Sequence, residues 1–442
     1  MSSKEITVIG AGLAGCEAAW QIARRGIKVR LCEMKPERYT PAHKSPLMAE
    51  LVCSNSLKAK RLESAAGLLK EEMRRLGSLL VPIAESCAVA AGGALAVDRE
   101  LFAQAVTKAI SEHPLIEVCS GEVTEIPEGI CVIATGPLTS DALAEQIEKL
   151  CGGERLSFYD AAAPIVTAES IDMEQAFAAS RYDRGDGDDY INCPMNKEQY
   201  EAFYAELVRA QRAETHDIDR PNVYEGCMPI EIMAQRGQDT IRFGPMKPVG
   251  LRDPRTGHRP WANLQLRRED VEGTRYNLVG FQTNLKFGEQ RRVFGMIPAL
   301  ANAEYVRYGV MHRNTFIDSP CLLSADFSLR ERPELFFAGQ MTGVEGYMES
   351  AGAGILAGIN AARRAQGEQP IVLPSDTMLG ALTAHVSDEA FSAEFQPMGA
   401  NFGILPSLST KIRDKQQRYA ALSARALESL QPILEIANNG LE

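Results

Sequence analysis

The chain has 442 residues, of which 45% are hydrophobic and 24% charged, and its formal net charge is -11. At roughly 100–200 residues per domain, this length predicts two or three domains. No apolar run approaches the ~18 residues of a membrane span, so we expect no transmembrane helix. The acidic net charge excludes indiscriminate nucleic-acid binding, which depends on cations that neutralise phosphates. Any RNA contact must therefore come from a local basic patch.

The N-terminus and the cysteines indicate a cytoplasmic location. Residues 1–5 lead directly into a strand-like segment, without the basic region and apolar core of a signal peptide. The ten cysteines include no Cys-x-x-Cys pair, so we expect neither a metal site nor a dithiol redox couple. The sequence does not fix the oligomeric state, and a monomer is the working expectation.

The first predicted unit is a dinucleotide-binding βαβ motif. Residues 6–9 predict a strand, residues 16–23 a helix and residues 28–33 a second strand. The turn matches G-x-G-x-x-G, whose glycines permit a tight turn, approach to a pyrophosphate and close helix packing. Glu33, 23 residues after Gly10, is positioned to bind an adenosine ribose. The predicted cofactor site therefore includes Gly10, Ala11, Gly12, Leu13, Ala14, Gly15 and Glu33.

Cys53 precedes a segment, residues 56–80, that predicts an amphipathic surface helix with Leu62 on its apolar face. A thiol at a helix N-terminus is favoured as thiolate by the helix dipole, which predicts a chemical role for Cys53. The alternative is a small buried residue, and position alone leaves both open.

Two later segments, residues 130–137 and 334–339, predict buried strands of a parallel sheet. A small-residue helix at 350–358 follows, and a charged helix spans 410–427. A C-terminal segment that returns to the cofactor is typical of two-dinucleotide flavin folds and favours FAD over NAD. The predicted cofactor residues of this segment are Gly339, Tyr347, Gly352 and Gly354. For Tyr347, a position near the isoalloxazine ring and ordinary packing are both open.

Between these segments the composition shifts toward Arg, Asp, Gly, Pro and aromatic residues. We therefore predict an α/β protein, a Rossmann-like FAD-binding domain (1–150 and 311–442, with a C-terminal helix) interrupted by an inserted α+β substrate domain at 151–310. Within the insert, Cys227 lies in a loop between Gly226 and Pro229, where nearby carboxylates oppose thiolate formation. The runs 242–252 and 280–292 combine cations with aromatics, as RNA-binding surfaces do.

Taken together, these segments resemble the folate- and FAD-dependent tRNA (uracil-5-)-methyltransferases over nearly the whole chain. The matching motifs are the glycine turn at 10–15, Leu51-Val52-Cys53-Ser54-Asn55-Ser56, residues 225–231, residues 243–250 and residues 280–284. The resemblance implies that Cys227 is the nucleophile and Cys53 a second essential thiol and candidate base. It also implies FAD, 5,10-methylenetetrahydrofolate and NAD(P)H as cofactors, and tRNA as the substrate.

The implied reaction makes carbon 5 of the T-loop uridine nucleophilic by thiolate addition at carbon 6. A methylene group from the folate, carried on flavin N5, is transferred to carbon 5. A base then removes the carbon 5 proton, and hydride from the reduced flavin completes the methyl group. NAD(P)H regenerates the reduced flavin.

Four alternatives remain open at the level of sequence. The same chemistry could act on ribosomal RNA, or the chain could be the related flavoenzyme that modifies the wobble uridine of tRNA, although those relatives carry a longer C-terminal region. A flavin-dependent RNA-binding protein without catalysis is a third reading, which retention of Cys53 and Cys227 disfavours. A simple flavin oxidase or disulfide reductase is the fourth.

Overall fold

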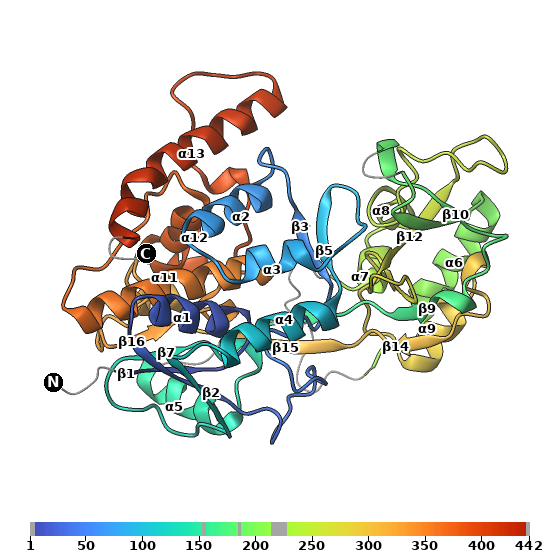
Figure 1. The fold of residues 1–442 in the computed structure, drawn as a ribbon. Coiled ribbons are helices and arrows are strands. Elements are labelled where there is room, and N and C mark those ends of the chain that lie inside the picture. Colours follow the sequence, from blue (N-terminus) through green and yellow to red (C-terminus); the bar gives the residue numbers. More distant parts are fainter. Residues whose placement is uncertain (1–4, 153–155, 184–186, 214–227, 439–442) are drawn as a thin grey trace.

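The computed structural model describes residues 5–152, 156–183, 187–213 and 228–438, which form two lobes (Figure 1). The first lobe combines the N-terminal and C-terminal parts of the chain, and the second is built from the middle of the chain. Within the described residues, no helix is long and apolar enough to cross a membrane.

A five-stranded sheet in the order β16-β7-β1-β2-β6 forms the centre of the first lobe. All four of its strand pairings are parallel. The apolar segments 130–137 and 334–339 both contribute strands to this parallel sheet, as predicted. The structure adds that these strands are neighbours, with Val132 paired to Val8 on one side and to Phe336 on the other. The strands are β1 (Glu5–Ile9), β2 (Lys28–Glu33), β6 (Ile116–Ser120), β7 (Cys131–Ile133) and β16 (Leu335–Phe337).

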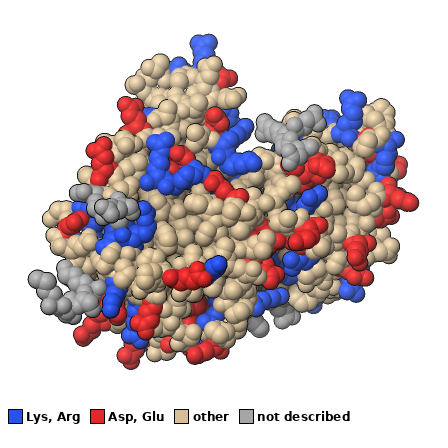
Figure 2. Space-filling model, in the orientation of Figure 1, with Lys and Arg blue, Asp and Glu red and all other residues tan. Residues whose placement is uncertain are grey.

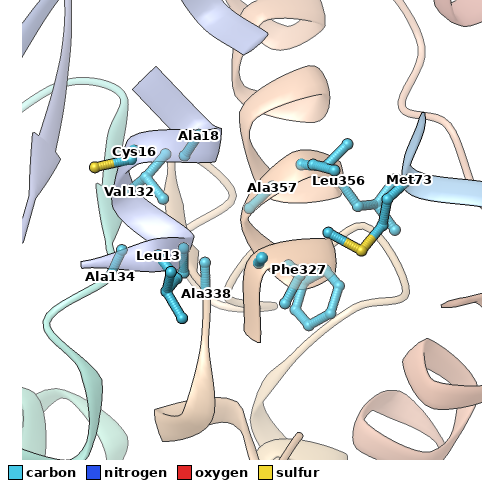
Figure 3. Packing of buried hydrophobic residues seen from close by; sticks show 14 of the residues in the cluster. Leu13, Cys16, Ala18, Met73, Val132, Ala134, Phe327, Ala338, Leu356 and Ala357 are labelled. Carbon is cyan, nitrogen blue, oxygen red and sulfur yellow. The ribbon is translucent and has the colours of Figure 1, made fainter. Parts of the chain in front are cut away.

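Helices α1 (Leu13–Arg24) and α11 (Tyr347–Gln366) pack closely against each other beside this sheet (Figure 3). Glycines in α11 make the approach possible. A Cβ added at Gly354 would lie 2.1 Å from the carbonyl oxygen of Ala14, and one added at Gly358 would lie 2.6 Å from that of Ala18. The backbones of the two helices are therefore in direct contact.

Further helices cover the first lobe: α2 (Ala65–Arg75), α3 (Leu80–Ser86), α4 (Arg99–Ser111), α5 (Asp141–Cys151), α10 (Ser319–Leu322), α12 (Met378–Ser387) and α13 (Lys415–Ala437). The predicted helix over 56–80 is wrong in its first part. Residues Ser56–Ala59 form strand β3, which pairs with β5 (Ala94–Val97), and β4 (Ala88–Val89) completes this small sheet. Helical hydrogen bonding begins only after Ser64, whose hydroxyl caps α2, and Leu62 is 42% exposed rather than packed.

The second lobe contains a six-stranded sheet in the order β10-β11-β12-β13-β9-β14. Its strands are β9 (Ile165–Thr167), β10 (Phe177–Ala178), β11 (Tyr190–Met195), β12 (Ala262–Arg268), β13 (Arg275–Leu278) and β14 (Tyr305–Arg307). Helices α6 (Lys197–Arg209), α7 (Ile230–Gln235), α8 (Gln238–Phe243) and α9 (Phe287–Phe294) accompany it. A separate hydrophobic core forms here around Tyr200, Phe203, Phe281 and Phe294.

The antiparallel pair β8 (Leu156–Ala161) and β15 (Met311–Phe316) connects the two lobes. The chain thus leaves the first lobe and returns to it along neighbouring strands. This architecture confirms the predicted fold class, a Rossmann-like α/β domain with an α+β insertion.

Candidate functional site

A cavity of about 440 Å³ lies at the carboxyl ends of the strands of the parallel sheet. This edge is where open parallel sheets bind ligands. Residues at or just after the end of each of the five strands contribute to its lining, including Gly10, Glu33, Gly121, Thr135 and Gly339. The cavity continues past the sheet to Cys53 and Tyr347.

The glycine turn has the geometry that binding of a pyrophosphate requires. Gly10 has φ +95°, a conformation that favours glycine, and a Cβ added at Gly15 would lie 1.8 Å from the oxygen of Gly10. A Cβ at Gly12, by contrast, would meet no described atom within 4 Å. Gly12 begins α1 without a side-chain cap, so the N–H groups of the first turn remain available to an anion.

The carboxylate of Glu33 is held at the end of β2 by two backbone donors. Ala11 N–H donates to one of its oxygens at 2.7 Å, and Lys35 N–H donates to the other at 3.0 Å. Leu13 and Ala14 also line the cavity, whereas Ala11 and Gly15 shape the turn from behind the lining.

Among the predicted C-terminal cofactor residues, Gly339 and Tyr347 line the cavity. Gly352 and Gly354 are buried in α11, away from the described lining. Gly354 meets the backbone of Ala14, and a Cβ at Gly352 would lie 3.0 Å from Leu379. The described contacts of these two glycines are therefore packing contacts.

Cys53 and Tyr347 meet at one end of the cavity. The phenolic oxygen of Tyr347 lies 2.9 Å from Cys53 Sγ, and it accepts hydrogen bonds from the backbone N–H groups of Cys53 (2.8 Å) and Ser54 (3.2 Å). The explanation of a Cys53 thiolate by a helix dipole is wrong, because the strand β3 follows Cys53. Burial is the main cause that raises the pKa of Tyr347 well above 10, so its hydroxyl stays protonated.

Among the described residues, three arginines contact the Cys53 loop. They come from distant segments, so no local sequence pattern indicates them. Arg267 donates to Asn55 Oδ1 and Ser54 Oγ, each at 2.8 Å. Arg99 donates to the carbonyl of Leu51 and pairs with Glu269. Arg307 donates weakly to the carbonyl oxygen of Cys53 at 3.5 Å.

The surroundings act differently on these cations. Burial lowers the pKa of Arg267 and of Arg307. Burial also opposes the charge of Arg99, but the adjacent carboxylate of Glu269 outweighs it and raises the pKa of Arg99. The site thus concentrates positive charge between the two lobes.

The predicted nucleophile, Cys227, lies outside the described residues. The two cation and aromatic runs do contain ordered surface clusters. In one, the guanidinium of Arg242 lies 3.8 Å from the ring centroid of Trp261. In the other, the 55% exposed ring of Phe287 stacks on Tyr308 with centroids 4.7 Å apart. Figure 2 shows basic and acidic side chains interspersed over the visible face.

The parallel sheet, the glycine turn and the Glu33 carboxylate define a Rossmann-like dinucleotide-binding protein with an inserted second domain. Residues 5–369 match the family model described as Glucose inhibited division protein A. The chain belongs to this family and, within it, to the methylenetetrahydrofolate--tRNA-(uracil-5-)-methyltransferases, as relatives of nearly the same length show.

Two such relatives are named Methylenetetrahydrofolate--tRNA-(uracil-5-)-methyltransferase TrmFO. The protein of Desulfitobacterium hafniense is 59% identical over 96% of this chain and 97% of its own length. The protein of Acetivibrio thermocellus is 60% identical over the same shares, 96% and 97%. These matches confirm the resemblance inferred from the sequence motifs.

Two solved structures of Aquifex aeolicus GidA have a similar fold. The form II crystal gives a TM-score of 0.70 at 17% identity, covering 98% of this chain and 74% of that chain. The form I crystal gives 0.71 at 18% identity, with 97% and 76% covered. At this identity the likeness supports the fold alone.

Proposed function

We propose that this protein methylates carbon 5 of the T-loop uridine of tRNA, with 5,10-methylenetetrahydrofolate as the carbon source and FAD as cofactor. The observation that carries the proposal is the cavity itself. It joins the pyrophosphate-type turn and Glu33 to the Cys53 and Tyr347 pair, in a chain about as long as relatives that bear this activity in their names. Because the proposed substrate and cofactors are found in the cytoplasm, we propose that the protein acts there.

The residues that line the cavity fit FAD. The open N-terminus of α1 at Gly12 suits the pyrophosphate, the carboxylate of Glu33 suits the adenosine ribose, and Tyr347 offers an aromatic ring near the far end. When bound, FAD supplies one-carbon transfer and hydride chemistry, and NAD(P)H returns it to the reduced form.

The protein supplies the groups that activate the uracil ring. The Cys227 thiolate adds to carbon 6, forming a carbon–sulfur bond and leaving carbon 5 electron-rich as an enolate. After carbon 5 has gained the one-carbon unit, Cys53 accepts its proton, and the electrons of that C–H bond expel the Cys227 thiolate. Tyr347 and the backbone at Ser54 fix the position of Cys53 during this step.

The test is transfer of label from 5,10-methylenetetrahydrofolate, labelled in its methylene carbon, to an unmodified tRNA transcript in the presence of FAD and NADPH. Nuclease digestion and mass spectrometry then locate the label. We expect 5-methyluridine in the T-loop, and its absence with Cys227→Ala. Cys321→Ala is the matched control, because Cys321 is an exposed cysteine of the first lobe outside the cavity lining.

The other outcomes separate the competing functions. Label at the wobble uridine favours the chemistry of the longer relatives, and label in ribosomal RNA but not tRNA changes the substrate. Binding of FAD and RNA without label in either RNA supports a non-catalytic RNA-binding protein. Turnover of NADPH with oxygen alone points to a simple oxidase.

A further inference from the structure

The hydrogen bonds at Tyr347 determine the direction of its contact with Cys53. The phenolic oxygen accepts two backbone N–H groups, from Cys53 and Ser54. These two bonds occupy its lone pairs, so the oxygen has none left to accept an S–H. Its own proton is then donated to Cys53 Sγ at 2.9 Å, which makes the sulfur an acceptor.

The charges around this sulfur favour an anion. Among the described residues, charged and titratable groups from several elements face the Cys53 loop: Arg99 from α4, Arg267 from β12, Glu269 just after β12, Arg307 from β14 and Tyr347 from α11. This set contains three guanidinium groups and one carboxylate. A positive excess in a buried place stabilises a neighbouring anion more strongly than it would in water.

Arg307 is the cation of this group whose hydrogen bonds are least satisfied. Arg99 has Glu269 and the Leu51 carbonyl, and Arg267 has two side-chain acceptors at 2.8 Å. Arg307 has a 3.5 Å contact to the Cys53 carbonyl, and its buried Nε has no acceptor among the described residues. Arg307 is half-buried, and a buried guanidinium nitrogen without an acceptor is costly for folding alone.

We propose that Arg307 and the hydroxyl of Tyr347 hold Cys53 as a thiolate, and that Arg307 is a positioning residue which acts through this sulfur. The second lobe thereby sets the state of a thiol that the first lobe carries. The use of this thiolate as a base rests on the proposed function. The existence of the thiolate does not depend on that function.

The pH dependence of alkylation of the FAD-loaded protein by iodoacetamide tests the proposal. Peptide mass spectrometry resolves each cysteine, and exposed Cys321 provides an internal reference for the reagent. We expect a midpoint for Cys53 below the ~8.5 of ordinary thiols. Arg307→Met should raise this midpoint by about one unit, a roughly tenfold smaller thiolate fraction near neutral pH.

Three further variants complete the design. Arg307→Lys keeps the charge and should retain most of the low midpoint, and Tyr347→Phe removes the donor and should raise it. Arg255→Met is the matched control in the same lobe, since Arg255 pairs with Asp253, and it should leave the midpoint unchanged. If Arg307→Met does not fold, the other two variants test the proposal: Tyr347→Phe should raise the Cys53 midpoint, and Arg307→Lys should retain most of the low midpoint.

An ordinary midpoint for Cys53 in the unmodified protein overturns the proposal. So does a midpoint that neither Arg307→Met nor Tyr347→Phe raises. A low midpoint in protein that transfers no label to RNA refutes the proposed function and leaves this inference standing.

Discussion

Replacing Gly354 by alanine tests the direct contact between α1 and α11. The new Cβ would lie 2.1 Å from the Ala14 carbonyl oxygen and 2.7 Å from its Cα. Backbone atoms cannot rotate away, so the helices must separate by more than about 1 Å to reach ordinary contact distance. Overpacking of this kind costs about 1–3 kcal/mol.

For a lobe of this size, 1 kcal/mol corresponds to roughly 2–4 °C in Tm, so we expect Gly354→Ala to lower Tm by about 3–10 °C. Gly288→Ala is the matched control. Gly288 is also helical, but a Cβ there meets no described atom within 4 Å. Since alanine favours helix by up to ~1 kcal/mol over glycine, this control should melt at the same temperature or slightly higher.

The assay is thermal unfolding of flavin-free protein by circular dichroism, followed by titration with FAD. The packing role predicts a lower Tm without any cofactor, and weaker FAD binding because α1 begins at the cavity. An unchanged Tm combined with weaker FAD binding would instead restore the cofactor contact that the sequence predicted for Gly354. A Tm at or above that of the unmodified protein would refute the close contact.

Three more outcomes follow from the site and its surroundings. Glu33→Gln removes the charge of the proposed ribose acceptor and should weaken FAD binding about tenfold or more in a fluorescence titration; equal affinity would contradict this proposed role. Phe287→Ala should weaken tRNA binding roughly five- to 150-fold by loss of a stacking surface, whereas Phe391→Ala, a change at another exposed phenylalanine in the first lobe, should not. Burial raises the pKa of Glu72 from 4.5 to about 7, so its contribution to stability is full below pH 4.5 and lost as pH rises through 7. Glu72→Gln should therefore flatten the fall of Tm between pH 5 and 7, and an unchanged slope would contradict this.

Local sequence patterns predicted the parts of the fold that local physics determines. The glycine turn, the strand ending at Glu33 and the two buried strands all follow from spacing and hydrophobicity. The prediction of a helix over 56–80 is wrong at its start, because pairing of β3 with β5 outweighs the helical periodicity of apolar residues there.

The candidate site, too, is predicted only in part, because local patterns do not show which distant residues meet. Cys53 and Tyr347 were each singled out, but nothing in the sequence showed that their side chains meet. Arg99, Arg267 and Arg307 lie in three separate segments, and only tertiary folding brings them to the same loop. Long-range convergence of this kind leaves no periodic pattern in one sequence.

The interrupted first lobe also has a consequence for how the protein is made on the ribosome. Strand β7 ends at Ile133, but its neighbour β16 begins only at Leu335, roughly 200 residues later. At about 5–20 residues per second, the ribosome takes roughly 10–40 s to synthesise that interval. The second lobe, whose core comes from one continuous stretch, emerges complete while the first still lacks both β16 and the helix that packs on α1. The cofactor site is therefore assembled late in synthesis, around a partner lobe whose own chain is already finished.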